Sequence, residues 1–157
     1  MLDHLQQFVF PAAFSLLPPE MDTPAARAML LCIALQESKC CHRRQLQGPA
    51  RGFYQFEKGG GVRGVLTHAA SKVHAQSAMT ALQYSNWSTE TAYEAIEHND
   101  TLATVFARLL LWTLPDALPS ATEPHAGWTI YIKAWRPGRP HVSTWDAHFE
   151  KAWSLVW

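Results

Sequence analysis

The chain has 157 residues, of which 48% are hydrophobic and 17% are charged, and its 13 basic residues balance its 13 acidic ones. This length suffices for one domain with its own apolar core, so we expect a single domain over residues 1–157. A formal net charge of zero lacks the basic excess that is typical of nucleic-acid-binding proteins, so no nucleic-acid partner is expected.

The first expected helices follow from local signals. Leucine, valine and phenylalanine recur at helical spacing over residues 2–17, where Pro11 is expected to bend or break the helix. Thr23 and Pro24 supply a hydroxyl at the N-cap and a proline at the first helical position. A helix is therefore expected over about residues 24–38. It is apolar on most sides and should run through the core.

The rest of the chain predicts more helix and almost no strand. Residues 45–56 hold two glycines, one proline and three aromatic residues, a composition typical of turns or a short hairpin. Ser88 and Asp100 are candidate N-caps. Further helices are expected at about residues 62–82, 89–98, 101–114, 124–134 and 144–154. The sequence thus predicts a mainly α fold around a central helix, with at most a small hairpin or sheet.

The cysteines and the N-terminal segment indicate in which kind of cellular compartment the protein is found. Cys32, Cys40 and Cys41 are odd in number and crowded together, which favours free thiols in a reducing environment. Residues 1–21 lack the basic start and the uninterrupted apolar stretch of a secretory signal. No run reaches the roughly 18 apolar residues that span a bilayer. We therefore expect no signal peptide and no membrane insertion.

Glu37 is a lone carboxylate at the end of the apolar helix expected at residues 24–38. A carboxyl group pressed against apolar side chains resists ionisation, so its pKa rises and it can donate a proton near neutral pH. The helix C-terminus adds a partial negative charge, which acts in the same direction. This placement predicts an enzyme that protonates a leaving oxygen. The alternative is a solvated carboxylate with no catalytic role.

Three segments carry a resemblance to a known family. The segments QES at residues 36–38, ARGFYQF at 50–56 and AWRPGR at 134–139 resemble three motifs of the lysozyme-like superfamily, especially of soluble lytic transglycosylases and goose-type lysozymes. The family motifs are a Glu-Ser that ends the catalytic helix, an Ala-x-Gly-Leu-Met-Gln-aliphatic segment and Ala-Tyr-Asn-x-Gly. Gln55 follows Glu37 by 18 residues, a separation like that of the family.

The resemblance implies an α+β lysozyme-like fold and cleavage of the β-1,4 bond between N-acetylmuramic acid and N-acetylglucosamine in bacterial peptidoglycan. We expect no cofactor and no metal. Glu37 would be the general acid, and Glu57 would be a second carboxylate that positions water, or else a surface residue paired with a neighbouring cation. In a transglycosylase, Glu37 would first act as the general acid and would then take the proton of the muramoyl 6-hydroxyl, which leaves a 1,6-anhydro end. The candidate substrate-binding residues, in these segments or close to them, are Ser38, Tyr54, Gln55, Tyr131, Trp135 and Arg136.

Some of these positions depart from the family pattern. Trp135 and Arg136 replace Tyr-Asn, so the hydroxyl of that tyrosine is missing, and Tyr131, one helical turn earlier, is the candidate replacement. Arg136 or Arg139 would contact carboxylates of the peptide stems, or would complement the dipole of the preceding helix. Gln55 would offer its amide to a sugar acetamido group, or would serve only its own turn.

Two other functions remain open. One is a cell-wall peptidase or amidase with a Cys–His pair, which needs a thiolate stabilised by a helix N-terminus or a nearby base. The other is a catalytically inactive glycan-binding relative. Five tryptophans between Trp128 and Trp157 would pack in the core or stack on sugars in a groove. A metal site is not expected, since no pair of ligand pairs occurs at zinc spacing.

A wall-degrading enzyme without an export signal needs another route to its substrate. Bacteriophages provide two routes. An endolysin waits in the host cytoplasm until a holin releases it to the periplasm, and a virion-associated enzyme arrives with the particle. We expect a monomeric muralytic enzyme of one of these two kinds. The choice between a hydrolase and a transglycosylase stays open.

Overall fold

The computed structural model describes residues 1–156, and their regular structure is helical. Among these residues, strand-like pairing is limited to isolated bridges from Arg51 to Arg44 and to Phe56. The predicted mainly α fold with at most a small sheet is confirmed. The elements in chain order are α1 (Leu2–His4), η1 (Leu5–Val9), α2 (Phe10–Phe14), η2 (Pro19–Met21), α3 (Pro24–Ser38), η3 (Lys58–Val62), α4 (Arg63–Thr67), α5 (Lys72–Ala81), α6 (Thr89–His98), α7 (Asp100–Trp112), α8 (Pro124–Trp135), η4 (Val142–Thr144) and α9 (Trp145–Ser154).

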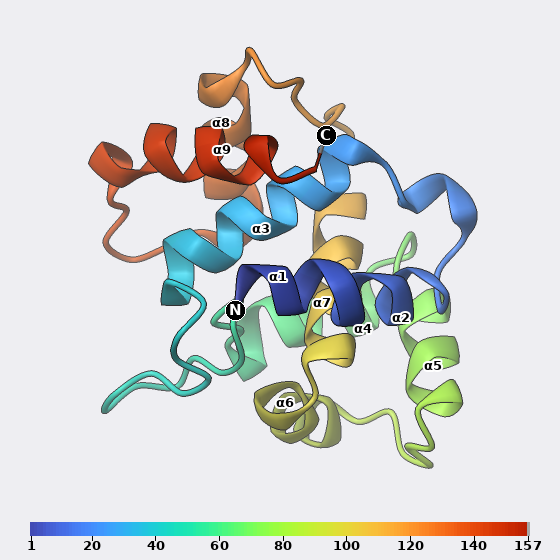
Figure 1. The fold of residues 1–157 in the computed structure, drawn as a ribbon. Helices are drawn as coiled ribbons and strands as arrows, with labels where there is room; N and C mark the ends of the chain where they lie inside the picture. The colour runs from blue at the N-terminus through green and yellow to red at the C-terminus, as the bar shows by residue number, and fades with distance from the viewer. Residues whose placement is uncertain (157) are drawn as a thin grey trace.

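The central element is α3, which crosses the middle of the molecule beside α9 in Figure 1. Its start is fixed by Thr23, whose Oγ1 accepts a hydrogen bond from the N–H of Ala26 at 3.1 Å, and by Pro24 at the first helical position. Most of its residues are buried, because it packs along α9 and against α7. The predicted bounds of this helix are confirmed.

The end of α3 leaves Glu37 on the last helical turn. Lys39 and Cys40 both adopt a left-handed conformation with a φ of 54°. The N–H of Lys39 bonds to the carbonyl oxygen of Leu35 at 2.9 Å, a closure typical of the αL motif. The chain therefore leaves the helix axis directly after Ser38 and enters the loop that leads to η3.

Pro11 changes the type of the N-terminal helix without breaking it. Proline has no N–H to donate, and the turn before it widens, so that the N–H of Phe10 bonds to Leu5 five residues back. Helical structure continues from Leu2 to Phe14 in three adjoining segments. The helical run predicted over residues 2–17 is thus three residues too long. Of the predicted bend or break at Pro11, the break does not occur.

Two further helix starts depend on side-chain caps. The Oγ of Ser88 accepts a hydrogen bond from the N–H of Thr91 at 3.1 Å, which confirms the predicted cap of α6. The cap of α7 is Asn99 instead of Asp100, since its Oδ1 accepts from the N–H of Leu102 at 3.0 Å. Asparagine and aspartate cap helices about equally well, so residue type alone does not choose between neighbours.

Candidate active site

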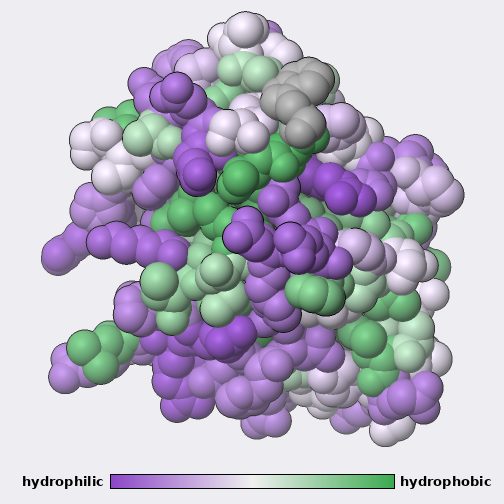
Figure 2. Space-filling view, in the orientation of Figure 1, coloured by the Kyte–Doolittle hydropathy of each residue, from purple (hydrophilic) through white to green (hydrophobic). Residues whose placement is uncertain are grey.

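A cleft of about 980 Å³ lies at the C-terminal end of α3. Residues from the end of α3, from the loop before η3, from α8 and from the segment 136–141 line its walls. Figure 2 shows a hollow on the left side of the molecule, between the segment that follows α8 and the loop that follows α3 in the orientation of Figure 1. Glu37 lies in this cleft.

The carboxyl group of Glu37 is half-buried, and Tyr131 Oη donates a hydrogen bond to its Oε1 at 2.6 Å. The pKa of Glu37 is raised to about 7, and burial is the main cause. The hydrogen bond from Tyr131 lowers this pKa, and the negative charge of Glu57 raises it further. A carboxyl group with this pKa is protonated in a large fraction of molecules near neutral pH. It is therefore suited to donate a proton.

The ring of Tyr131 is held in place by its neighbours on α9. It stacks on Trp145 with the ring centroids 5.1 Å apart and the planes inclined by 17°. Burial and the neighbouring charge of Glu37 raise the pKa of the Tyr131 hydroxyl, so it keeps its proton and acts as the donor. The hydroxyl that Trp135 lacks is thus present beside Glu37, one helical turn earlier on α8.

The turn that carries Gln55 is bonded to two helices through its own backbone. Ser38 Oγ donates to the carbonyl oxygen of Phe53 at 2.7 Å, and Trp135 Nε1 donates to that of Tyr54 at 2.8 Å. These bonds hold the turn against the end of α3 and against α8. Three segments far apart in the sequence therefore meet around one carboxyl group.

Gln55 lines the cleft in a left-handed conformation with a φ of 52°. Its Nε2 donates to the carbonyl oxygen of Gly52 at 2.9 Å, which supports the turn. No donor within residues 1–156 bonds to its Oε1, so this oxygen can accept a hydrogen bond from a ligand. Gly52, with a φ of 73°, approaches Ile96 so closely that a Cβ would lie 2.9 Å from its carbonyl oxygen.

Two residues predicted to bind substrate do not line the cleft. Ser38 is buried, and its hydroxyl also lies 3.1 Å from the carbonyl oxygen of Ala34. Tyr54 is only 1% exposed, and its hydroxyl bonds to Thr104 Oγ1 at 3.1 Å. Both side chains hold structural elements together instead, because they point from the motif into the core.

Glu57 lines the same cleft and is exposed. The neighbouring cation does not neutralise it, because Lys58 pairs with Glu90 at 2.7 Å. Within residues 1–156 the carboxylate of Glu57 forms no ion pair, and its charge acts on Glu37.

A run of glycines forms the wall next to Glu57. Gly60 interrupts η3 with a φ of −100° and a ψ of −106°, and a Cβ on Gly61 would lie 2.5 Å from the ring of Phe56. The chain therefore packs directly on that ring, and the wall carries no side chain that would fill the cleft. The helix predicted over residues 62–82 begins four residues earlier, at Lys58, and is interrupted between α4 and α5.

Sequence reasoning gave no role to Gln36, which joins α3 to the opposite wall. Its Nε2 donates to the carbonyl oxygen of His141 at 2.9 Å. Its Oε1 accepts from Thr144 Oγ1 at 3.0 Å and lies 2.9 Å from His148 Nδ1. These partners follow more than a hundred residues later in the chain, so no local signal identifies them.

Most of the aromatic residues in α8 and α9 pack against one another and do not line the cleft. Trp145 and Trp153 are buried, and Trp128 packs edge-on against Trp145 with the ring centroids 5.5 Å apart. Trp135 is half-buried and lines the cleft. Trp157 lies outside the described residues.

The thiols do not form part of the cleft within residues 1–156. Cys32 and Cys40 are buried, and burial raises the pKa of Cys40 to about 12 and raises that of Cys32 as well. Cys41 is exposed, and its Sγ lies 3.2 Å from the carbonyl oxygen of Lys39. A buried thiol with a raised pKa is a poor nucleophile, which disfavours a peptidase mechanism at these two positions.

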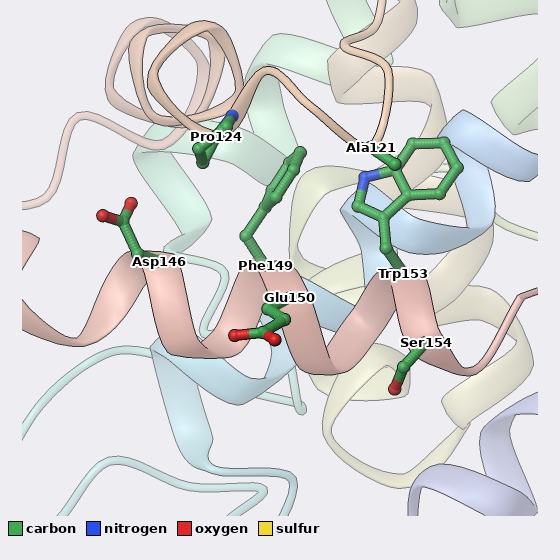
Figure 3. A pocket seen from close by; sticks show the side chains of 7 residues that line it. All are labelled: Ala121, Pro124, Asp146, Phe149, Glu150, Trp153 and Ser154. Atoms are coloured by element: carbon green, nitrogen blue, oxygen red, sulfur yellow. The ribbon is translucent and has the colours of Figure 1, made fainter.

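A second, smaller cavity of about 420 Å³ lies between α9 and the start of α8 (Figure 3). Phe149 and Trp153 rise from α9 toward Pro124 and Ala121, while the carboxylates of Asp146 and Glu150 lie at its edge. Its lining shares no residue with the cleft.

The chain matched no protein-family model, no curated protein and no solved structure. Within residues 1–156, no helix has the length and apolar character to cross a membrane. In the same part of the chain, no group of three His, Cys, Asp or Glu side chains is placed to hold a metal ion.

Proposed function

We propose that this protein is a muramidase that cleaves the β-1,4 bond between N-acetylmuramic acid and N-acetylglucosamine in peptidoglycan. The supporting observation is the half-buried carboxyl group of Glu37, which lies in an open cleft with a hydrogen bond from Tyr131 and a pKa of about 7. The cleft volume of about 980 Å³ is at the upper end of the range for ligand sites.

Glu37 acts as the general acid. Its proton passes to the bridging oxygen as the bond from that oxygen to the anomeric carbon of the muramoyl residue breaks, and the sugar develops positive charge. The Tyr131 hydroxyl then donates to the carboxylate that remains. Hydrogen bonds to a charged acceptor are stronger than those to a neutral one, so this contact strengthens as the proton leaves.

The second step has two forms, which differ in their product. In hydrolysis, Glu57 positions a water molecule and takes one of its protons as the water oxygen bonds to the anomeric carbon, which leaves a reducing end. In transglycosylation, the muramoyl 6-hydroxyl adds instead, its proton returns to Glu37, and a 1,6-anhydro end forms. The negative charge of Glu57 acts at Glu37, beside the proposed reaction centre. It would therefore stabilise the positive charge of the sugar in both forms of the second step.

Two further residues complete the proposed substrate site. The Oε1 of Gln55 accepts the N–H of an acetamido group, since its own amide N–H already supports the turn. The exposed part of the Trp135 ring packs on a sugar face, while its Nε1 stays bonded to Tyr54. The resemblance further leads us to propose that the monomeric protein serves a phage, as an endolysin released by a holin or as a virion enzyme.

Mass spectrometry of the fragments released from purified peptidoglycan tests the activity, the bond and the product together. We expect glycan cleavage by the wild-type protein and by Glu94→Gln, a matched change at an exposed carboxylate outside the cleft. The rate of glycan cleavage by Glu37→Gln should be lower by a factor of about 100 or more, because the variant has no general acid.

The outcomes separate the alternatives. Reducing ends identify a hydrolase, and 1,6-anhydro ends identify a transglycosylase. Peptide fragments released from intact glycan would support the Cys–His alternative and contradict the proposal. Undiminished wall cleavage by a folded Glu37→Gln variant, with folding checked by circular dichroism, would also contradict it.

A further inference from the structure

The segment that follows α8 brings two guanidinium groups into the wall of the cleft. Arg136 and Arg139 both line the cleft that holds Glu37. Within residues 1–156, neither side chain forms a hydrogen bond or an ion pair. Lys133, on the same wall, is by contrast paired with Asp116 at 2.9 Å. The cleft therefore has unneutralised positive charge along one wall, although the whole chain has a net charge of zero.

The backbone at Arg136 is in an unfavourable conformation. It ends α8 in the left-handed region with a φ of 48° and a ψ of 53°, and Pro137 follows it. Glycine or asparagine usually occupies such a helix end, and an arginine there is strained. The dipole of α8 favours a cation at Arg136, but it does not reach Arg139, which lies four residues beyond the last residue of the helix.

The same segment is fixed relative to the carboxyl group of Glu37. Pro137 and Pro140 restrict its backbone. Gln36, the residue before Glu37, bonds to the carbonyl oxygen of His141 at 2.9 Å. The two guanidinium groups are therefore carried by a segment that is joined to the end of α3. Binding a ligand there requires little additional ordering of the backbone.

We propose that Arg136 and Arg139 form an anion subsite for the carboxylates of the glycan strand, beside the bond that Glu37 cleaves. This inference rests on the proposed function. Guanidinium groups bind carboxylates through paired, charge-assisted hydrogen bonds. The strand has two sources of this chemistry: the carboxylates of its peptide stems and the lactyl carboxylate that is free where a stem has been removed. Neither arginine is among the groups that shift the pKa of Glu37.

The test compares three strand preparations: stem-bearing strands, amidase-treated strands with free lactyl carboxylates, and amidase-treated strands whose carboxylates have been converted to methylamides. The readout is the ratio of kcat/KM on each charged strand to kcat/KM on the methylamide strand. Binding of the same strands to Glu37→Gln protein, followed by tryptophan fluorescence, measures recognition independently of cleavage.

The variants are Arg136→Gly, Arg139→Gln and their combination. Glycine at residue 136 keeps the left-handed backbone and removes its strain, so this variant should fold at least as well as the wild type. The matched control is Lys151→Gln, which removes one exposed positive charge from α9 outside the cleft.

We expect the wild-type and control proteins to prefer a charged strand. Each arginine substitution should reduce this preference about threefold to fivefold, near the upper end for an exposed ion pair. A preference confined to stem-bearing strands assigns the stem carboxylates, and one confined to amidase-treated strands assigns the lactyl carboxylate. Equal use of all three strands by the wild type, or an undiminished preference in the double variant, overturns the subsite. Failure of the proposed function is distinguishable, because the wild type would then cleave none of the strands.

Discussion

The contact between Tyr131 and Glu37 gives a prediction with a defined sign and size. Tyr131→Phe removes the hydroxyl that donates to Glu37 at 2.6 Å and keeps the ring that stacks on Trp145. A hydrogen bond to a charged acceptor contributes about 1.5–3 kcal/mol. One pKa unit corresponds to about 1.4 kcal/mol, and Glu37 is only half-buried, so we take the lower end and expect a rise of about one unit. The pKa of Glu37 should move from about 7 to about 8.

The assay is the pH dependence of kcat on solubilised glycan strands. A general acid must be protonated to act, so activity falls as the pH rises through its pKa. In Tyr131→Phe this alkaline limb should therefore move to higher pH by about one unit, and the plateau should fall because the acid is weaker. Tyr84→Phe is the matched control, because its hydroxyl bonds to Asn99 outside the cleft. An unmoved limb, or a move to lower pH, would refute the reasoning.

Two further predictions concern the same carboxyl group. Glu57→Gln removes a negative charge that raises the pKa of Glu37, so the alkaline limb of kcat should move to lower pH, opposite to the effect of Tyr131→Phe; a limb at higher pH would contradict this. Glu37→Gln should also change stability. Since the pKa of Glu37 is raised from 4.5 to about 7 on folding, the stabilising contribution of its protonated form is complete below pH 4.5 and is lost as the pH rises through 7. The free energy of unfolding of the variant, measured with urea, should therefore equal that of the wild type near pH 4 and exceed it by at most about 3 kcal/mol near pH 8.5. Equal stability of the two proteins at both pH values would show that the carboxyl group is not desolvated.

The central helix could be predicted from the sequence because its signals are local. Thr23 and Pro24 begin it, and the apolar residues that follow require burial on most sides. The position of Glu37 at its end follows from these signals alone. The surroundings of that carboxyl group do not, because Tyr131 follows 94 residues later and reaches it only through the packing of α8 on α9.

The direction of side chains within the motifs was the harder part. Ser38 and Tyr54 belong to the segments that form the site, but both point into the core, where they bond to Phe53 and Thr104. A motif identifies a segment, and the choice between cleft and core depends on one or two backbone dihedral angles at each residue. The left-handed residue Gln55 shows this, since its conformation places its side chain in the cleft directly after the buried Tyr54.

The packing of α3 on α9 has a consequence for the synthesis of the protein. Their last residues, Ser38 and Ser154, are 116 residues apart. At about 5–20 residues per second, a ribosome needs roughly 6–23 s to complete the second helix after it has completed the first. For most of this interval the side of α3 that packs on α9 has no lasting cover, and His141 and Thr144, the partners of Gln36, have not yet been made. The nascent chain should therefore require protection from aggregation and should acquire a complete cleft only late in translation.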